Sequence, residues 1–154
     1  MFTALTLFAL VLSAPPVNPE EAAVKEMLHG RFDALNRRDA KWLADHFVDD
    51  GEDGEHVDAS GNRTIGRANI RKTSQAVFDS PVYKDVEWKG EVERVKFITP
   101  DVAMVDATWD QSGHDAKGVA AHRSGKSLLI LRKTDEGWEI VSSRASPKPA
   151  KAAK

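Results

Sequence analysis

The 154-residue sequence contains no cysteine, which excludes disulfides, thiolate zinc sites, iron–sulfur clusters and a cysteine nucleophile. It also has little charge of one sign, because 22 basic and 24 acidic side chains give a formal net charge of −2. Nucleic-acid binding needs a basic surface that neutralises phosphates, so we expect no nucleic-acid partner. Phosphate loops, dinucleotide fingerprints and Gly-x-Ser-x-Gly motifs are absent too, and the sequence predicts no cofactor. The length fits one domain.

Long apolar runs are also scarce, and one stands out at the N-terminus. Residues 2–14 are uncharged, mostly apolar and followed by Pro15-Pro16. Thirteen residues are too few to cross ~30 Å of hydrocarbon comfortably, but they suit the apolar region of a signal peptide. We therefore expect a signal peptide over residues 1–14 and a secreted or periplasmic bacterial protein with no membrane contact after processing. An apolar N-terminal helix or strand of the folded domain is the alternative.

The apolar periodicity between the two ends of the chain changes once, near Tyr83. Before it, Asn18-Pro19 is a strong helix start, Asp39 can cap a second short helix, and a third helix follows Gly66. Residues 147–154 are rich in lysine and proline, and we expect a disordered basic tail there. The folded domain is thus predicted over residues 20–146.

The second half of the domain is predicted to consist of long strands. Asp101–Gln111 alternates between two faces, Ser127–Lys133 is apolar on both, and Asp135–Gly137 forms a turn into the last strand. Val86–Ile98 changes its apolar face near Glu93-Arg94, which predicts a β-bulge or a bend. Helices followed by long bent strands predict an α+β fold, with the helices on one face of a curved antiparallel sheet.

Three segments occur in a characteristic order: Leu43–Asp50, Gly61–Ile70 and the hairpin Leu128–Val141. Together they resemble the SnoaL-like branch of the nuclear transport factor 2-like superfamily. The resemblance covers residues 20–146 and implies a cystatin-like cone, in which three N-terminal helices pack in the concave face of a strongly curved antiparallel sheet. Such proteins enclose a pocket and are often dimeric. Many relatives carry a histidine after the last Trp-x-Ile, where this sequence reads Ser142–Ser146.

Candidate catalytic residues come from an acidic stretch and from one histidine. Alternation back from Val57 predicts that Asp53 and Glu55 point into the pocket, where either carboxylate could act as a general base. A solvated acidic loop is the alternative. His122 leads into a strand and could face the cavity as an acid or base, or be structural. Neither the histidines nor this stretch has metal-ligand spacing, so we expect no metal site.

Candidate ligand-binding residues are two tryptophans, one histidine and one arginine. Trp88 and Trp109 lie on the long middle strands and could form an aromatic wall for an apolar ligand, or simply belong to the core. His46 adjoins Phe47 and could line the pocket mouth. Arg144 would need a carboxylate or an anionic ligand if its strand face is concave, and is otherwise a surface residue.

These patterns favour a small exported protein that binds a small, partly apolar molecule in the cone cavity. The superfamily also includes isomerases, dehydratases and hydrolases, so an isomerase or hydrolase that uses a pocket carboxylate as base is an alternative. A homodimeric association module is another. Val102, Met104 and Thr108 share the strand face opposite Ala103 and its inward neighbours. We therefore expect a homodimer through the outer face of the sheet.

Overall fold

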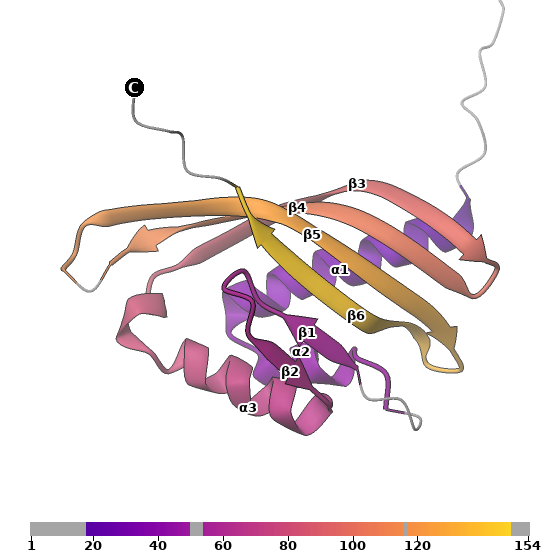
Figure 1. Ribbon diagram of the computed structural model, residues 1–154, viewed down its shortest axis with the longest axis horizontal. Coiled ribbons are helices and arrows are strands. Elements are labelled where there is room, and N and C mark those ends of the chain that lie inside the picture. The colour runs from indigo at the N-terminus through magenta and orange to yellow at the C-terminus, as the bar shows by residue number, and fades with distance from the viewer. Residues whose placement is uncertain (1–17, 50–53, 116, 149–154) are drawn as a thin grey trace, which may run out of the picture.

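The computed structural model describes residues 18–49, 54–115 and 117–148, and shows helices gathered on one face of a six-stranded sheet (Figure 1). The helices are α1 (Pro19–Arg37), α2 (Ala40–Asp45) and α3 (Arg67–Phe78), with a 3-10 turn η1 (Pro81–Tyr83). The strands are β1 (Glu55–Val57), β2 (Arg63–Ile65), β3 (Glu87–Thr99), β4 (Val102–His114), β5 (Ala120–Thr134) and β6 (Gly137–Pro147). The predicted α+β class is confirmed. Within the described residues, no helix combines the length and the apolar character that crossing a membrane requires.

Side-chain caps determine where the first two helices begin. Asn18 Oδ1 accepts a hydrogen bond from the Glu20 N–H at 3.0 Å, and Pro19 follows as the first helical residue. Asp39 Oδ1 accepts one from the Trp42 N–H at 2.8 Å. Both predicted starts are confirmed, as is the start of α3 after Gly66.

The sheet order is β2-β1-β6-β5-β4-β3, and β3 to β6 form an antiparallel meander. One pair departs from the fully antiparallel sheet that the sequence predicted, because β1 pairs with β6 in parallel, with Glu55 opposite Ser142. The chain leaving α2 already runs beside β6 in this direction, since the Val48 N–H donates to the Ile140 carbonyl at 3.0 Å. The direction of β1 follows from that earlier contact.

Three register shifts interrupt the pairing of the long strands. One lies between Val92 and Arg94 of β3, where the sequence predicted a bulge or bend, and a second lies between Phe97 and Thr99 of the same strand. The third is in β6 and was not predicted: Ile140 pairs with Leu131, whereas Ser142 pairs with Ile130, so Val141 is an extra residue. A bulge of this kind reverses the inward and outward alternation of all later residues in the strand.

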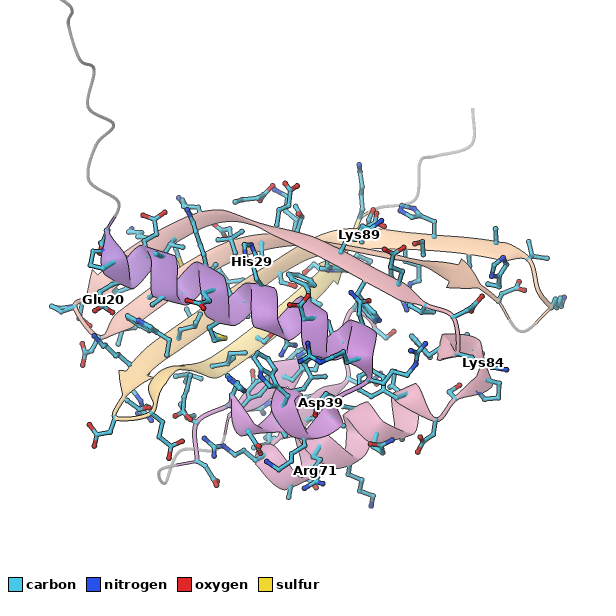
Figure 2. All side chains as sticks on the ribbon, turned by 180° about the vertical axis from the view of Figure 1, so that it is seen from behind. Glu20, His29, Asp39, Arg71, Lys84 and Lys89 are labelled. Carbon is cyan, nitrogen blue, oxygen red and sulfur yellow. The ribbon has the colours of Figure 1, made fainter. Side chains whose placement is uncertain are left out.

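The hydrophobic core fills one end of the concave face, which we call the closed end. It consists of inward side chains from β4, β5 and β6, none more than 5% exposed: Ala103, Val105, Leu131, Trp138 and Ile140. The inward direction predicted for Ala103 and Val105 is confirmed. Helix α1 covers this end, and Figure 2 shows its first turn, at Glu20, close to the strand ends. Glu20 accepts hydrogen bonds from Trp138 Nε1 at 3.0 Å and Lys133 Nζ at 2.6 Å.

The two ends of the chain lie mostly outside the described residues. The expected signal peptide over residues 1–14 falls there entirely, and so do residues 149–154 of the expected tail. Pro147, which the sequence assigned to the tail, is the last residue of β6, and the Lys148 N–H donates to the Ser124 carbonyl at 2.8 Å. The sheet therefore continues one residue beyond the predicted domain boundary.

Candidate functional site

A cavity of about 510 Å³ lies between the helices and the other end of the concave face, which we call the cavity end. Its strand residues include Trp109 and Gln111 of β4, Ser127 of β5, and Ser143 and Ala145 of β6. Apolar side chains from the helical side complete the wall, including Phe32, Leu35 and Val77. Pockets of ~300–1,000 Å³ with mostly apolar walls and a few polar groups are typical small-molecule sites.

The two tryptophans expected at the cavity lie there. Trp109 is 7% exposed, and its Nε1 donates to the Lys126 carbonyl at 3.2 Å. Gly125 makes room for this ring, because a Cβ at that position would stand 2.6 Å from Trp109 Cζ2. Trp88 is held through its backbone, which exchanges hydrogen bonds of 2.8 and 2.9 Å with the side chain of Asn36. Their role in binding a ligand stays a prediction.

A positive charge without a partner also faces the cavity. Arg31 is on α1, three residues after Leu28 and four before Leu35, and lines the cavity with them. No described residue forms a hydrogen bond or ion pair with it, and its guanidinium carbon lies 5.7 Å from the centroid of the Phe47 ring. Burial lowers the pKa of Arg31 to about 10, so the side chain remains charged at neutral pH.

A neutral imidazole also lies close to Phe47. The His56 ring is edge-on to the Phe47 ring, with 6.5 Å between centroids, and its Nδ1 is buried without a hydrogen-bond partner. Burial, followed by the charge of Arg31, lowers the pKa of His56 to about 4, although Asp58 and the Ser143 backbone act in the opposite direction. The ring is therefore uncharged at neutral pH.

The third ionisable group that lines the cavity near Phe47 is Asp58, whose hydrogen bonds stabilise the local structure. It accepts hydrogen bonds from the Ser60 N–H at 2.8 Å, the Asn62 N–H at 3.0 Å and Asn62 Nδ2 at 2.9 Å. Burial acts to raise the pKa of Asp58, but these hydrogen bonds outweigh it and lower the pKa below its ordinary value. The carboxylate therefore stabilises the turn between β1 and β2 and is a poor proton acceptor.

The prediction that Glu55 points into the pocket is wrong. Glu55 is 8% exposed and contacts Arg63 at 2.5 Å and Arg144 at 2.6 Å, on the side of β1 away from the cavity. Burial raises its pKa, but the two arginines outweigh that effect and keep the pKa below its ordinary value. The phase of β1 is opposite to the one assumed, so His56 faces inward. Asp53 lies outside the described residues.

Two further expectations need correction. His122 does not face the cavity: its side chain is 60% exposed and lies 2.5 Å from Asp110. It is an even number of residues from the outward-facing Leu128, so strand alternation places both on the outer side of β5. Arg144 lies outside the cavity as well, because the extra residue Val141 in β6 turns it outward, toward Glu55.

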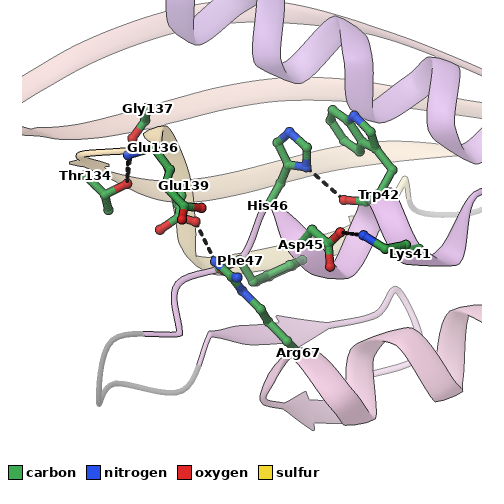
Figure 3. A network of polar contacts seen from close by, with 10 residues as sticks. All are labelled: Lys41, Trp42, Asp45, His46, Phe47, Arg67, Thr134, Glu136, Gly137 and Glu139. Carbon is green, nitrogen blue, oxygen red and sulfur yellow. Dashed lines mark hydrogen bonds and ion pairs between the residues drawn. The ribbon is translucent and has the colours of Figure 1, made fainter.

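His46 does not line the cavity, because its side chain is hydrogen-bonded to and stacked on Trp42 of α2. Its Nδ1 donates to the Trp42 carbonyl at 2.8 Å, and the two rings stack with 3.6 Å between centroids (Figure 3). Among the described residues, no group of three or more histidine and carboxylate side chains is placed to hold a metal ion.

The Arg31 guanidinium and the His56 Nδ1 atom have no hydrogen-bond or ion-pair partner among the described residues, and neither residue was predicted as a site residue from the sequence. A signal for Arg31 was present, since an arginine between Leu28 and Leu35 interrupts the apolar stripe of a core-facing helix. His56 had no comparable signal, because a three-residue strand is too short to show its phase.

The Gly66-Arg67 segment connects the helices to the sheet beneath this site. Arg67 Nε donates to the Phe47 carbonyl, and its Nη2 contacts Glu139 of β6, each at 2.5 Å (Figure 3). The backbone that carries Phe47 is thereby fixed between Arg31 and His56.

The chain matches the model of the SnoaL-like domain over residues 24–150. It belongs to the SnoaL-like domain family. No curated protein matches this SnoaL-like chain.

Solved structures show the same fold. A cystatin-like domain of unknown function from Nostoc punctiforme is 24% identical, with a TM-score of 0.73 over 88% of this chain and 82% of that one. A ketosteroid isomerase-like protein from Erwinia carotovora atroseptica is 20% identical, with a TM-score of 0.72 over 86% and 99%. A candidate scytalone dehydratase from Novosphingobium aromaticivorans is 18% identical, with a TM-score of 0.73 over 85% of each chain. Proteins with this fold thus include some named for isomerase or dehydratase activity beside others of unknown function.

Proposed function

We propose that this SnoaL-like protein binds a small, partly apolar molecule in the cavity between its helices and its sheet. The observation that carries the proposal is the cavity itself, about 510 Å³ in volume and walled by aromatic and aliphatic side chains. Filling such a space would remove apolar surface from water on both molecules, which is favourable by roughly 25 cal/mol per Å² before the costs of association.

Binding is favoured over catalysis by the state of the carboxylates. A general base needs a pKa raised toward neutrality and a free lone pair. Glu55 is paired with two arginines outside the cavity, and Asp58 accepts three hydrogen bonds. The pKa of both carboxyl groups is lowered. Among the described residues, this chain therefore has no carboxylate in the cavity that is suited to act as the base for the activities after which some structural neighbours are named.

The test is a calorimetric titration of the protein with 2-naphthamide, a neutral apolar probe. Ala145 of β6 lines the cavity, whereas Ser146 beside it is exposed on the opposite face. We expect Ala145→Trp to weaken binding by about tenfold or more, because the indole occupies ligand space, and Ser146→Trp to leave it within about twofold. Thermal unfolding of both variants checks that they fold. Equal affinities for the wild type and both variants would place the probe elsewhere and contradict the proposal.

We also propose that two copies associate through the outer face of the sheet. Leu128 is 40% exposed there, and Met104 pairs with Ile130 on the neighbouring strands, so the three form one apolar patch. A self-complementary patch is covered most simply by a second copy. Sedimentation should show a dimer that Met104→Lys splits, and a wild-type monomer at high micromolar concentration would refute this proposal.

A further inference from the structure

Some polar groups of the cavity have hydrogen-bond partners within the protein, whereas others have none among the described residues. Asp58 has three donors, and Trp109 Nε1 has the Lys126 carbonyl. Arg31 has no hydrogen-bond or ion-pair partner among the described residues, and His56 Nδ1 is buried without one. Buried charges in proteins are normally paired, since an isolated one has lost its hydration without compensation.

We infer that the ligand of this cavity carries a single carboxylate and that Arg31 binds it. The inference rests on the proposed function and names the chemical class of the ligand: a small apolar monocarboxylic acid. A guanidinium presents N–H donors in a planar fork that matches a carboxylate, and such charge-assisted hydrogen bonds are stronger than neutral ones. Arg31 is only partly exposed in the folded protein, so part of its desolvation has already occurred and the ligand meets a preorganised site.

The charge around the cavity favours one negative charge over two. Among the described residues, the fully charged side chains that line it are Arg31, Arg123 and Asp58, which leave one net positive charge, and His56 is neutral. One carboxylate neutralises that charge. A phosphate monoester carries about −1.5 to −2 at neutral pH and would leave an uncompensated charge among apolar walls. The apolar part of the ligand would then lie along Phe32, Leu35 and the two tryptophans.

The test compares two probes of nearly the same shape, 2-naphthoate and the neutral 2-naphthamide. We expect the wild type to bind 2-naphthoate about tenfold more tightly, and Arg31→Met to abolish that preference while changing 2-naphthamide affinity by less than about threefold. Methionine keeps much of the arginine's apolar length, so the wall is preserved. Arg71→Met is the matched control, since it removes the same charge from an exposed position of α3 that does not line the cavity, and it should retain the preference.

The outcomes separate this inference from the proposed function. If neither probe binds, both fail. If both bind equally to the wild type, or if Arg31→Met keeps the preference, the cavity binds apolar molecules but the inference is wrong. If 2-naphthyl phosphate binds more tightly than 2-naphthoate, the assignment to a monocarboxylic acid is wrong.

A second readout comes from His56, which reports on the charge beside it. Burial is the main cause of the low pKa of His56, the charge of Arg31 lowers it further, and Asp58 and the Ser143 backbone act in the opposite direction. A carboxylate bound to Arg31 offsets the arginine's charge, so saturation with 2-naphthoate should raise the pKa of His56, measured by NMR, whereas 2-naphthamide should not raise it through charge. The His56→Asn variant identifies the resonance. A His56 pKa that does not change with 2-naphthoate would overturn the assignment of Arg31 as the carboxylate-binding residue.

Discussion

The closed end and the cavity end are built from the same three strands, yet they are packed differently. At the closed end, Leu131 and Ile140 are fully buried against side chains of α1 such as Val24. At the cavity end, Ser127 and Ala145 of the same strands face open space. The strands run through both ends, so the difference arises from what lies opposite them: α1 covers the closed end directly, whereas a cavity separates the sheet from the helices at the other end.

Polar pairing differs between the ends in the same way. The indole N–H of Trp138 at the closed end donates to Glu20, which also binds Lys133, so this cluster is satisfied. At the cavity end, neither the Arg31 guanidinium nor the His56 Nδ1 atom has a hydrogen-bond or ion-pair partner among the described residues. Unsatisfied groups lower stability and persist where they serve a function. The difference between the two ends therefore supports the proposal that the closed end stabilises the fold and that the cavity end binds a ligand.

The largest expected effect comes from the same truncation made at each end. Leu131→Ala removes a fully buried side chain from the closed end and should lower the free energy of unfolding by about 2–5 kcal/mol. Leu35→Ala removes a partly exposed side chain that already borders open space, and should cost about 1 kcal/mol. Urea denaturation of both variants measures the contrast. Equal losses would mean that the cavity is filled by side-chain movement in solution.

The second-largest expected effect is a pH-dependent change in the free energy of unfolding, caused by His56 at the cavity end. The pKa of His56 is about 4 in the folded protein against 6.5 ordinarily, so between these values the unfolded chain binds the extra proton. The wild type should therefore lose about 2 kcal/mol of stability through this group between pH 7 and pH 5. His56→Asn should lack that part of the loss. Unfolding free energies at both pH values test this, and parallel profiles of the two proteins would contradict a buried neutral imidazole.

The contrast between the two ends also limits what the sequence could predict. Helix starts, the bulge near Glu93-Arg94 and the order of helices and strands follow from local chemistry, and the structure confirms them. The candidate site depends on strand phase, which a single residue reverses. In β6, the extra residue Val141 reverses the alternation, so Arg144 points outward. In β1, the phase is opposite to the predicted one, so Glu55 points away from the cavity and His56 points into it. Neither the extra residue in β6 nor the phase of β1 can be recognised in the hydrophobic pattern of the sequence.

The third effect is a gain in stability. Arg31→Met removes from the wall of the cavity a charge that has no hydrogen-bond or ion-pair partner among the described residues, so the unliganded variant should be more stable by about 1 kcal/mol. Arg123→Met, at an exposed position, should leave stability within about 0.5 kcal/mol of the wild type. Calorimetric melting in the absence of any ligand provides the comparison. A lower melting temperature for Arg31→Met would show that the arginine is stabilised by contacts within the protein.

The smallest effect concerns the closed end, where Glu20 joins the first turn of α1 to Trp138 and Lys133. The hydrogen bonds from Lys133 and Trp138 lower the pKa of Glu20 below 4.5. A carboxyl group whose pKa is lowered by folding contributes stability above its unfolded value, and that contribution disappears as the pH falls through the folded value. Glu20→Gln should therefore melt slightly below the wild type at pH 7, and the gap should narrow as the pH approaches 3. The contacts are at the surface, so the gap should be smaller than any of the effects above. A gap that stays constant down to pH 3 would mean that the glutamate acts through packing, and that the closed end depends on its apolar core alone.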